Sequence, residues 1–205
     1  MNTSIKISEI KIGVKNCLEN ATELIQDADL LLKNRRFART HSLTQLALEE
    51  VGKAMMLYEF YNALQMDNRK EFDFKKFRKN FYNHKWKTFE STMVNLMMYT
   101  EKESYNLKSD DFKKYALDHF EDILKVKSGH YDDLKNNSLY VSLKNNKFCK
   151  PTELFNEKDT LEFFNKSKRK VEFITNQTFK WLDIDQWLGA DREGIVTRLQ
   201  KELKK

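Results

Sequence analysis

An arginine and a histidine, Arg78 and His84, stand with five residues between them in the aromatic and basic stretch FRKNFYNHKWK. A neutral imidazole takes up a proton readily near neutral pH, so it suits removal of the proton from a ribose 2′-OH. A guanidinium stabilises the negative charge that grows on a phosphorane. The pair therefore predicts metal-independent RNA cleavage, with His84 as general base or acid and Arg78 stabilising the transferring phosphate.

The residues around this pair suit a nucleic-acid ligand. Lys85 and Lys87 add positive charge for phosphates, and Tyr82 or Trp86 offers a ring on which a base stacks. The same composition is also typical of an ordinary amphipathic helix, whose aromatic residues enter the core and whose lysines face water. The stretch by itself leaves both interpretations open.

The direction of the two side chains depends on the helix that carries them. Aromatic residues at helical spacing predict one helix from about residue 74 to about residue 98. On a straight helix Arg78 and His84 differ in direction by about 120°, so one copy does not easily close on one substrate atom. Two copies related by a two-fold axis would place His84 of one chain opposite Arg78 of the other. A homodimer acting on RNA is therefore expected.

Metal and cofactor chemistry has little support in the sequence. No two histidines have the spacing of a metal-binding helix, and the five glycines form no phosphate-binding loop. His41, beside a basic corner, is expected at the surface, and His119, on an apolar stripe, is expected in the core. His130 lies in a turn-rich segment and follows no pattern. We expect neither a metal nor a cofactor.

A carboxylate, Glu50, falls on the apolar stripe of a second expected helix. A buried carboxylate must be paired or hydrogen-bonded, because burying it alone is too costly. The candidate partners are Lys53, Arg39 and the Arg78/His84 pair. Three roles for Glu50 stay open, with Lys53 beside it: a structural ion pair, a group that orients His84 or Arg78, and direct catalysis.

The elements that position these residues are expected to be long helices. Apolar residues at 3–4 spacing predict helices over residues 7–34 and 37–64, joined by a basic corner into an antiparallel hairpin. A fourth helix is expected after Ser109, and Asn156 is expected to cap a fifth. Gly52 predicts close approach of another helix, because glycine inside a helix is destabilising by about 1 kcal/mol relative to alanine.

One segment departs from the helical pattern. The strand-like residues around Tyr140, the pair Asn145-Asn146 and the following Lys-Phe-Cys predict a small β-hairpin or extended insertion near residues 138–150. Five glycines and one proline are too few for a β-sandwich or barrel. No linker divides the chain. We therefore expect one all-α domain over residues 1–183, with residues 184–205 packed on it as a short helix or tail.

Charge and hydropathy narrow the class of protein. Lys and Arg exceed Asp and Glu by 37 to 31, giving a net charge of +6 and a pI near 9.1. This excess suits a polyanionic partner without requiring one. The start lacks the apolar run of a signal peptide, and no stretch of 18 apolar residues occurs. A cytoplasmic location with no membrane contact is expected, which unpaired cysteines also favour.

Several blocks of the sequence resemble one family. DADLLLKNRRFAR at 27–39 and LALEEVGKA at 46–54 are similar to the N-terminal signature of the AbiV abortive-infection proteins, which belong to the HEPN superfamily of helical bundles. SLYVSL at 138–143 and KPTE at 150–153 resemble a short segment before the family's last long helix. The blocks occur in the right order and cover roughly residues 20–175.

The resemblance implies a HEPN-like helical bundle and a bacterial anti-phage protein, usually dimeric. Many members of the superfamily are metal-independent endoribonucleases with an Arg-x4–6-His motif, which Arg78 and His84 match. Lys79 follows the arginine where such motifs often place a polar helper, so that role falls to Asn80, Asn83 or neither. The family's biology also implies a resting state that a phage-encoded protein releases.

Two functions of different classes follow from these observations. The first is RNA cleavage, triggered by phage infection, that arrests translation or growth. The second is a non-catalytic HEPN module that binds a phage protein, RNA or the translation machinery, because some HEPN proteins have lost catalysis. A DNA-binding bundle is disfavoured, since the sequence contains no short recognition helix of the helix-turn-helix type.

Overall fold

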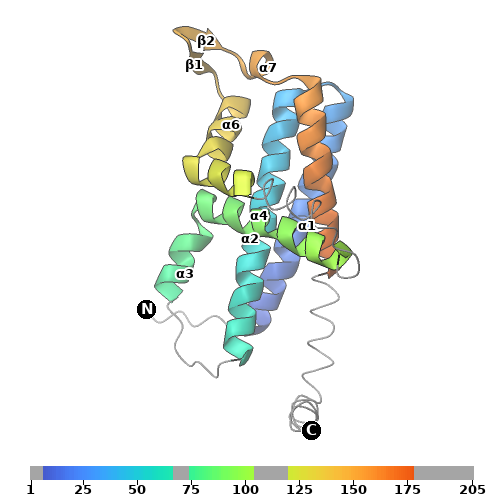
Figure 1. Cartoon of the computed structure of the whole chain (residues 1–205), viewed down its shortest axis with the longest axis vertical. Helices are drawn as coiled ribbons and strands as arrows, with labels where there is room; N and C mark the ends of the chain where they lie inside the picture. The colour runs from blue at the N-terminus through green and yellow to red at the C-terminus, as the bar shows by residue number, and fades with distance from the viewer. Residues whose placement is uncertain (1–6, 67–73, 104–119, 178–205) are drawn as a thin grey trace.

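The structure is a computed structural model that describes residues 7–66, 74–103 and 120–177. Two long helices, α1 (Ile7–Lys33) and α2 (Phe37–Met66), lie side by side and form the spine of the molecule (Figure 1). The corner between them places Arg35 in the left-handed region, at φ 57°. The expected antiparallel helical hairpin is confirmed, and the helix bounds differ from the predicted ones by no more than two residues.

The core lies along the contact between α1 and α2. The buried apolar residues of α1 recur every three or four positions, as its sequence predicts: Ile10, Val14, Leu18, Ala21, Ile25 and Ala28. α2 adds Ala47, Val51, Ala54 and Leu57 to the same cluster, and helix 157–177 adds Phe164, Val171 and Ile174. Three long helices therefore share one hydrophobic core.

The remaining face of α2 is also covered. It contacts α4 (His84–Glu103), α6 (His130–Leu139) and α7 (Pro151–Leu154). Polar residues fill this second face, and each is at most 5% exposed: Thr40, His41, Ser42, Thr44, Gln45 and Glu49. A helix covered on two faces has little amphipathic asymmetry, so its sequence pattern does not show which polar residues are inside.

The expectation that His41 lies at the surface is therefore wrong. Its ring is 5% exposed and packs between two aromatic rings, with centroid distances of 4.8 Å to Phe155 and 4.3 Å to Phe163. The adjacent basic corner suggested solvent, but α7 and helix 157–177 cover this end of α2.

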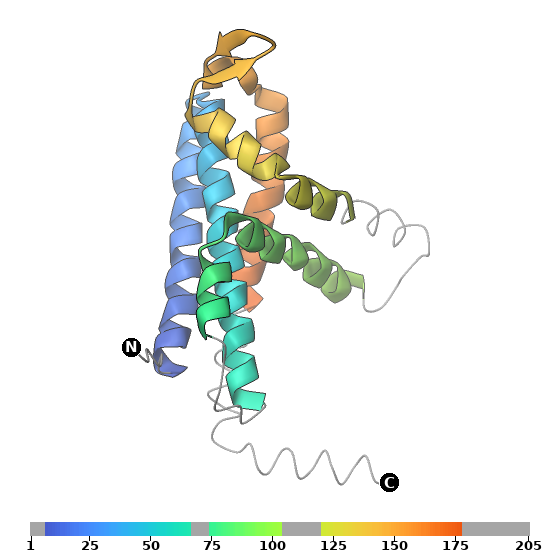
Figure 2. The same cartoon turned by 90° about the vertical axis from the view of Figure 1, so that its left-hand side faces the viewer.

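The single helix expected over residues 74–98 is also wrong, because the chain forms two helices there. α3 (Phe74–Phe81) ends and α4 begins across Tyr82-Asn83. The Asn83 side-chain oxygen accepts hydrogen bonds from the backbone N–H groups of Lys85 at 2.9 Å and Trp86 at 3.3 Å. Asn83 is thus the N-cap of α4. Figure 2 shows that α4 then runs across the spine rather than along it.

A second helical segment crosses the spine beside α4. Helix 120–128 and α6 meet at Gly129, whose φ of 82° turns the chain between them. Figure 2 shows this segment and α4 projecting to the same side of the long helices. The start of the helix expected after Ser109, with His119, lies outside the described residues.

The predicted β-hairpin is confirmed. β1 (Ser142–Lys144) pairs antiparallel with β2 (Lys147–Cys149). Asn145 and Asn146 connect them with φ values of 48° and 62°, as in the type I′ turns in which asparagine is favoured. The strands are shorter than the apolar run suggested, because α6 continues to Leu139.

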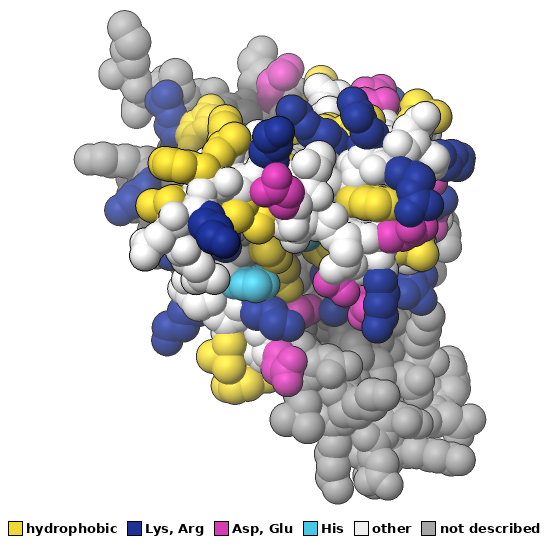
Figure 3. All heavy atoms as spheres, turned by 90° about the horizontal axis from the view of Figure 1, so that it is seen from above, with side chains coloured by type: hydrophobic (Ala, Val, Ile, Leu, Met, Phe, Trp, Pro, Cys, Tyr) yellow, Lys and Arg dark blue, Asp and Glu magenta, His cyan; other side chains and the backbone are white. Residues whose placement is uncertain are grey.

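The hairpin and the chain leading into it expose large hydrophobic side chains, between 60% and 80% for Tyr140, Val141, Leu143 and Phe148. Figure 3, which looks onto this end of the molecule, shows hydrophobic side chains among scattered lysines and arginines. None of the four belongs to the buried cluster, so the hairpin contributes little to the core.

The predicted cap of the last described helix is confirmed, since the Asp159 backbone N–H donates to the Asn156 side-chain oxygen at 2.9 Å. The observed architecture is all-α with one small hairpin, as expected. The segment 184–205 lies outside the described residues. Within the part of the chain that is described, no helix is long and apolar enough to span a bilayer.

Candidate active site

A buried carboxylate, Glu49, organises the candidate site. Its side chain is 3% exposed, on the second face of α2. Oε2 lies 2.7 Å from His84 Nδ1 and 3.0 Å from Lys87 Nζ, both on α4. Oε1 lies 2.6 Å from Lys135 Nζ on α6. One carboxylate therefore ties three helices together at the point where they cross.

The surroundings of Glu49 keep its carboxyl ionised. Burial alone would raise its pKa, but hydrogen bonds from Lys135, His84 and Lys87 outweigh that effect and hold the pKa below the ordinary 4.5. Two ammonium groups and one imidazole thus face a permanent negative charge at neutral pH. Together the lysines exceed the carboxylate by one positive charge, so the cluster favours an anion.

His84 differs from the other members of the cluster because its side chain is 56% exposed. An ionised carboxylate can only accept, so the 2.7 Å contact with Glu49 is a hydrogen bond when Nδ1 carries the proton, and in that tautomer the lone pair is on Nε2. Lys135 Nζ, 3.1 Å from Nδ1, is then a neighbour that shares the same carboxylate. A buried carboxylate that fixes the tautomer of an accessible histidine is the arrangement by which serine proteases prepare their general base.

The structure brings Glu49 to His84, and Glu50 faces elsewhere. Glu50 Oε1 lies 2.6 Å from Lys53 Nζ, and both side chains are partly buried. Burial, together with the charge and hydrogen bond of Glu50, raises the pKa of Cys17 on α1 to about 12. Of the three candidate partners for Glu50, Lys53 is the one that the structure shows. The apolar pattern of α2 reflects only the side that faces α1. It therefore pointed to Glu50, whereas Glu49, on the other covered face, is the glutamate that contacts His84.

Close contact between α2 and α4 depends on Gly52. A Cβ atom built there would lie 1.9 Å from the backbone oxygen of Lys87, closer than any real Cβ contact. The close helix approach predicted from this glycine is confirmed. Lys87 thus contacts Gly52 through its backbone and Glu49 through its side chain. The absence of a side chain at Gly52 therefore lets α4 lie close enough to α2 for Lys87 to reach Glu49.

The expected nucleic-acid contacts divide into two groups. Lys87 is 6% exposed and directs its ammonium at Glu49, so the expectation that it contacts phosphate does not fit this structure. Lys85 is exposed, and Tyr82 and Trp86 are 66% and 44% exposed. These three lie with His84 at the junction of α3 and α4, where the first turn of α4 favours negative charge.

Arg78 is exposed on α3, five residues before Asn83, the last residue between α3 and α4. Within the described part of the chain its guanidinium forms no ion pair with a carboxylate. The two asparagines considered as polar helpers have different environments. The Asn83 side chain is occupied by the α4 cap, whereas for Asn80 the backbone oxygen accepts from the Asn83 N–H at 2.9 Å. The 120° separation calculated for a straight helix does not apply.

Lys135, like Glu49, is a member of the cluster that the sequence did not indicate. It lies 86 residues after Glu49, in a helix with no motif, and is 8% exposed. Its only signal would have been a lysine on the inner side of α6 that needs an acidic partner.

A family model described as AbiV, of the HEPN type, matches residues 9–172. The chain belongs to the AbiV family. The match covers Glu49, Arg78, His84 and Lys135, and it confirms the resemblance to HEPN abortive-infection proteins noted in the sequence. No curated protein and no solved structure matches the chain.

In this AbiV-family chain, the described residues include no group of three or more His, Cys, Asp or Glu side chains placed to hold a metal ion. The ammonium groups of Lys87 and Lys135 already occupy both oxygens of Glu49. A cation at Glu49 would have to displace these two ammonium groups.

We expect the stability of this AbiV-family chain to fall with pH below about 4.5. The Glu49 pKa is lower in the folded chain than in the unfolded chain, so its stabilisation is complete above the ordinary value of 4.5 and is lost as pH falls through the folded value. Urea-unfolding free energies over a pH series test this. Glu49→Gln removes the titrating group and should flatten the profile, and identical acid slopes in both proteins would contradict the assignment.

Proposed function

We propose that this protein is a metal-independent endoribonuclease that acts in abortive infection, cleaving RNA and arresting translation or growth of the infected cell. The observation that carries the proposal is the pair formed by exposed His84 and buried Glu49, 2.7 Å apart. A carboxylate that holds Nδ1 leaves Nε2 free to take a proton, which is the first requirement of RNA transesterification.

The proposed reaction uses the 2′-hydroxyl of the substrate as nucleophile. His84 Nε2 takes the 2′-OH proton, the 2′-oxygen bonds to the adjacent phosphorus, and the bond from phosphorus to the 5′-oxygen breaks. Glu49 stabilises the imidazolium that forms, because its carboxylate oxygen lies 2.7 Å from Nδ1. In the proposed homodimer, protonated His84 of the second copy gives a proton to the leaving 5′-oxygen. The products are a 2′,3′-cyclic phosphate and a 5′-hydroxyl.

Arg78 is proposed to stabilise the phosphorane. It is exposed and has no ion-pair partner among the described residues, so its charge is available to a phosphate. Lys85 adds a second cation at the surface, and the exposed rings of Tyr82 and Trp86 offer stacking surfaces for bases. We propose a phage-encoded protein as the trigger, since an active nuclease would harm an uninfected host.

The test compares RNA ends in cells that carry the wild type, His84→Ala, Arg78→Ala or the control Lys79→Ala, with and without phage. Lys79 is an exposed lysine next to Arg78 and has no assigned role. RNA is sequenced by a method that captures 2′,3′-cyclic phosphate ends. We expect new ends only during infection, in the wild type and Lys79→Ala, and loss of at least about 10²-fold in the other two.

Equal end profiles in all four strains, with protection retained, would overturn the proposal. They would favour the alternative in which the HEPN fold acts by binding a phage protein, RNA or the translation machinery. New ends that persist in His84→Ala would remove the catalytic role of His84.

A further inference from the structure

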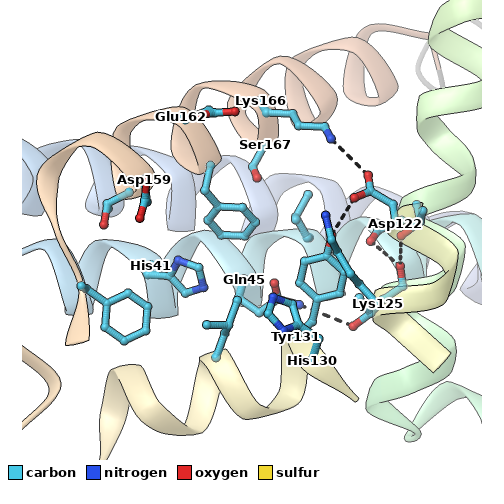
Figure 4. A pocket seen from close by; sticks show the side chains of 18 of the residues that line it. His41, Gln45, Asp122, Lys125, His130, Tyr131, Asp159, Glu162, Lys166 and Ser167 are labelled. Atoms are coloured by element: carbon cyan, nitrogen blue, oxygen red, sulfur yellow. Dashed lines mark hydrogen bonds and ion pairs between the residues drawn. The ribbon is translucent and has the colours of Figure 1, made fainter. Parts of the chain in front are cut away.

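A cavity of about 440 Å³ lies beside the candidate site, between α2, α4, α6 and helix 157–177 (Figure 4). It shares α2 and α4 with that site, but Glu49, Arg78 and His84 do not line it. Its volume is in the range of small-molecule and cofactor sites. The cavity is therefore a separate compartment that the proposed RNA cleavage does not use.

Three of its lining residues have buried polar atoms without a hydrogen-bond partner in the described structure. These are His41 Nε2, Gln45 Oε1 and Thr160 Oγ1, in side chains that are 5%, 1% and 1% exposed. Buried polar groups in folded proteins nearly always have partners, because an unpaired one destabilises the fold. All three belong to side chains that line this one cavity.

The end of the cavity that holds His41 is lined by aromatic rings. His41 stacks on Phe163 at 4.3 Å and 24°, and Phe155 lies 4.8 Å away. Burial lowers the His41 pKa to about 4, so the ring is neutral and Nε2 can exchange a hydrogen bond with a ligand. Figure 4 places Asp159 at this end, where with Gln45 Oε1 it offers acceptors for ligand N–H groups.

The opposite end is positively charged. Figure 4 places Lys125, Lys166 and Asp122 there, and Lys170 also lines the cavity. Lys166 Nζ lies 3.1 Å from Asp122 Oδ2, and the Tyr131 hydroxyl donates to Asp122 at 2.9 Å. Lys125 also pairs with Glu121 at 3.9 Å, so the ammonium groups of Lys166 and Lys170 share the carboxylate of Asp122 at this end. Lys170 is 6% exposed, and burial lowers its pKa to about 8, as expected of a cation that lacks a full counter-charge.

We propose that this cavity binds a nucleotide, with its base among His41, Phe155 and Gln45 and its phosphate at Lys166 and Lys170. A base is planar and carries N–H donors, which suits the aromatic end with its acceptors. A phosphate is anionic, which suits the end with the ammonium groups. This binding does not depend on RNA cleavage, so either proposal can fail without the other.

The test measures binding to the purified full-length chain by calorimetry and thermal shift. The probes are ATP, GTP, AMP and GMP, with adenosine, guanosine and inorganic phosphate as controls. We expect at least one nucleotide to bind once per chain and to raise the melting temperature, and the controls to bind about tenfold or more weakly.

Variants locate the binding. Lys170→Met and Gln45→Leu keep the approximate size of each side chain and should weaken binding about tenfold or more. Lys168→Met is the matched control, because Lys168 is on the same helix, outside the cavity, and pairs with Glu172 at the surface. Circular dichroism of each apo variant verifies the fold.

Two results would overturn the inference. One is the absence of heat and of a thermal shift with all four nucleotides at millimolar concentration. The other is binding that survives Lys170→Met and Gln45→Leu but is lost in Arg78→Ala, which would assign the nucleotide to the candidate RNA site.

Discussion

Glu49→Gln is expected to lower the proposed RNA cleavage by about 10²- to 10⁴-fold. We expect this loss although the Glu49 side chain is 3% exposed and is not accessible to a substrate in solution. Glutamine preserves the shape of the side chain but removes the charge. In the proposed reaction, the amide would no longer stabilise the imidazolium that His84 becomes after taking the 2′-OH proton. It also presents either an oxygen or an NH₂ group to Nδ1, so the tautomer with a free Nε2 is no longer enforced.

The same substitution is expected to destabilise the fold. Lys87 and Lys135 are largely buried and both pair with Glu49, so glutamine leaves two ammonium groups close together without a counter-charge. Removing one partner of a buried ion pair typically destabilises by about 3–5 kcal/mol. Urea unfolding followed by circular dichroism measures this loss, and assays of cleavage well below the melting temperature separate it from the loss of activity.

Glu50→Gln is the matched control, because it makes the same chemical change at the next residue. Glu50 pairs with Lys53 and lies beside Cys17, away from His84. We expect its cleavage rate to stay within about twofold of the wild type and its stability to change by about 1 kcal/mol. Wild-type cleavage by Glu49→Gln would exclude the role assigned to Glu49.

A double variant distinguishes the two effects of Glu49→Gln. Lys87→Met in the Glu49→Gln background removes one of the two stranded ammonium groups and should recover part of the stability. It should not recover cleavage, because His84 still lacks its carboxylate. Recovery of both together would mean that the single variant lost activity only through unfolding.

Gly52→Ala is expected to destabilise the fold by about 3 kcal/mol or more, against the usual trend for alanine in helices. Its Cβ would lie 1.9 Å from the Lys87 backbone oxygen and 2.6 Å from the Lys87 carbonyl carbon. Backbone atoms cannot rotate away as a side chain does, so α4 must move away from α2. That movement also separates Lys87 from Glu49, and both stability and cleavage should fall.

Gly13→Ala provides the control for Gly52→Ala. Its Cβ would lie 3.1 Å from Leu57 Cδ1, the end of a side chain that adjusts by a small rotation. We expect a change within about 1 kcal/mol of the wild type, since relief of the glycine penalty offsets the tight contact. Equal losses in the two variants by urea unfolding would refute the argument from the α2–α4 contact.

Local signals made much of the fold predictable. The 3–4 spacing of α1 reflects one buried face, the Asn145-Asn146 pair has the conformational freedom that a type I′ turn needs, and Asn156 caps through its own side chain. Each of these features depends on interactions within a few residues. Sequence patterns are most informative about such features.

The remaining features depend on contacts between distant segments. Which of Glu49 and Glu50 faces His84 is decided by the helices that cover the second face of α2, and Lys135 reaches the site from a segment 86 residues away. The break between α3 and α4 was hidden for another reason. Aromatic spacing continues across it, and only the Asn83 cap, formed with the N–H groups that follow it, marks the boundary.

The corner at Tyr82-Asn83 has a consequence for the number of residues between the arginine and the histidine. Along an uninterrupted helix, one inserted residue would swing His84 by about 100° and carry it away from Glu49. Where two helices meet, the connecting turn absorbs the extra residue, and the first turn of α4 stays docked. Insertions should therefore be tolerated at Tyr82-Asn83 but not within α4.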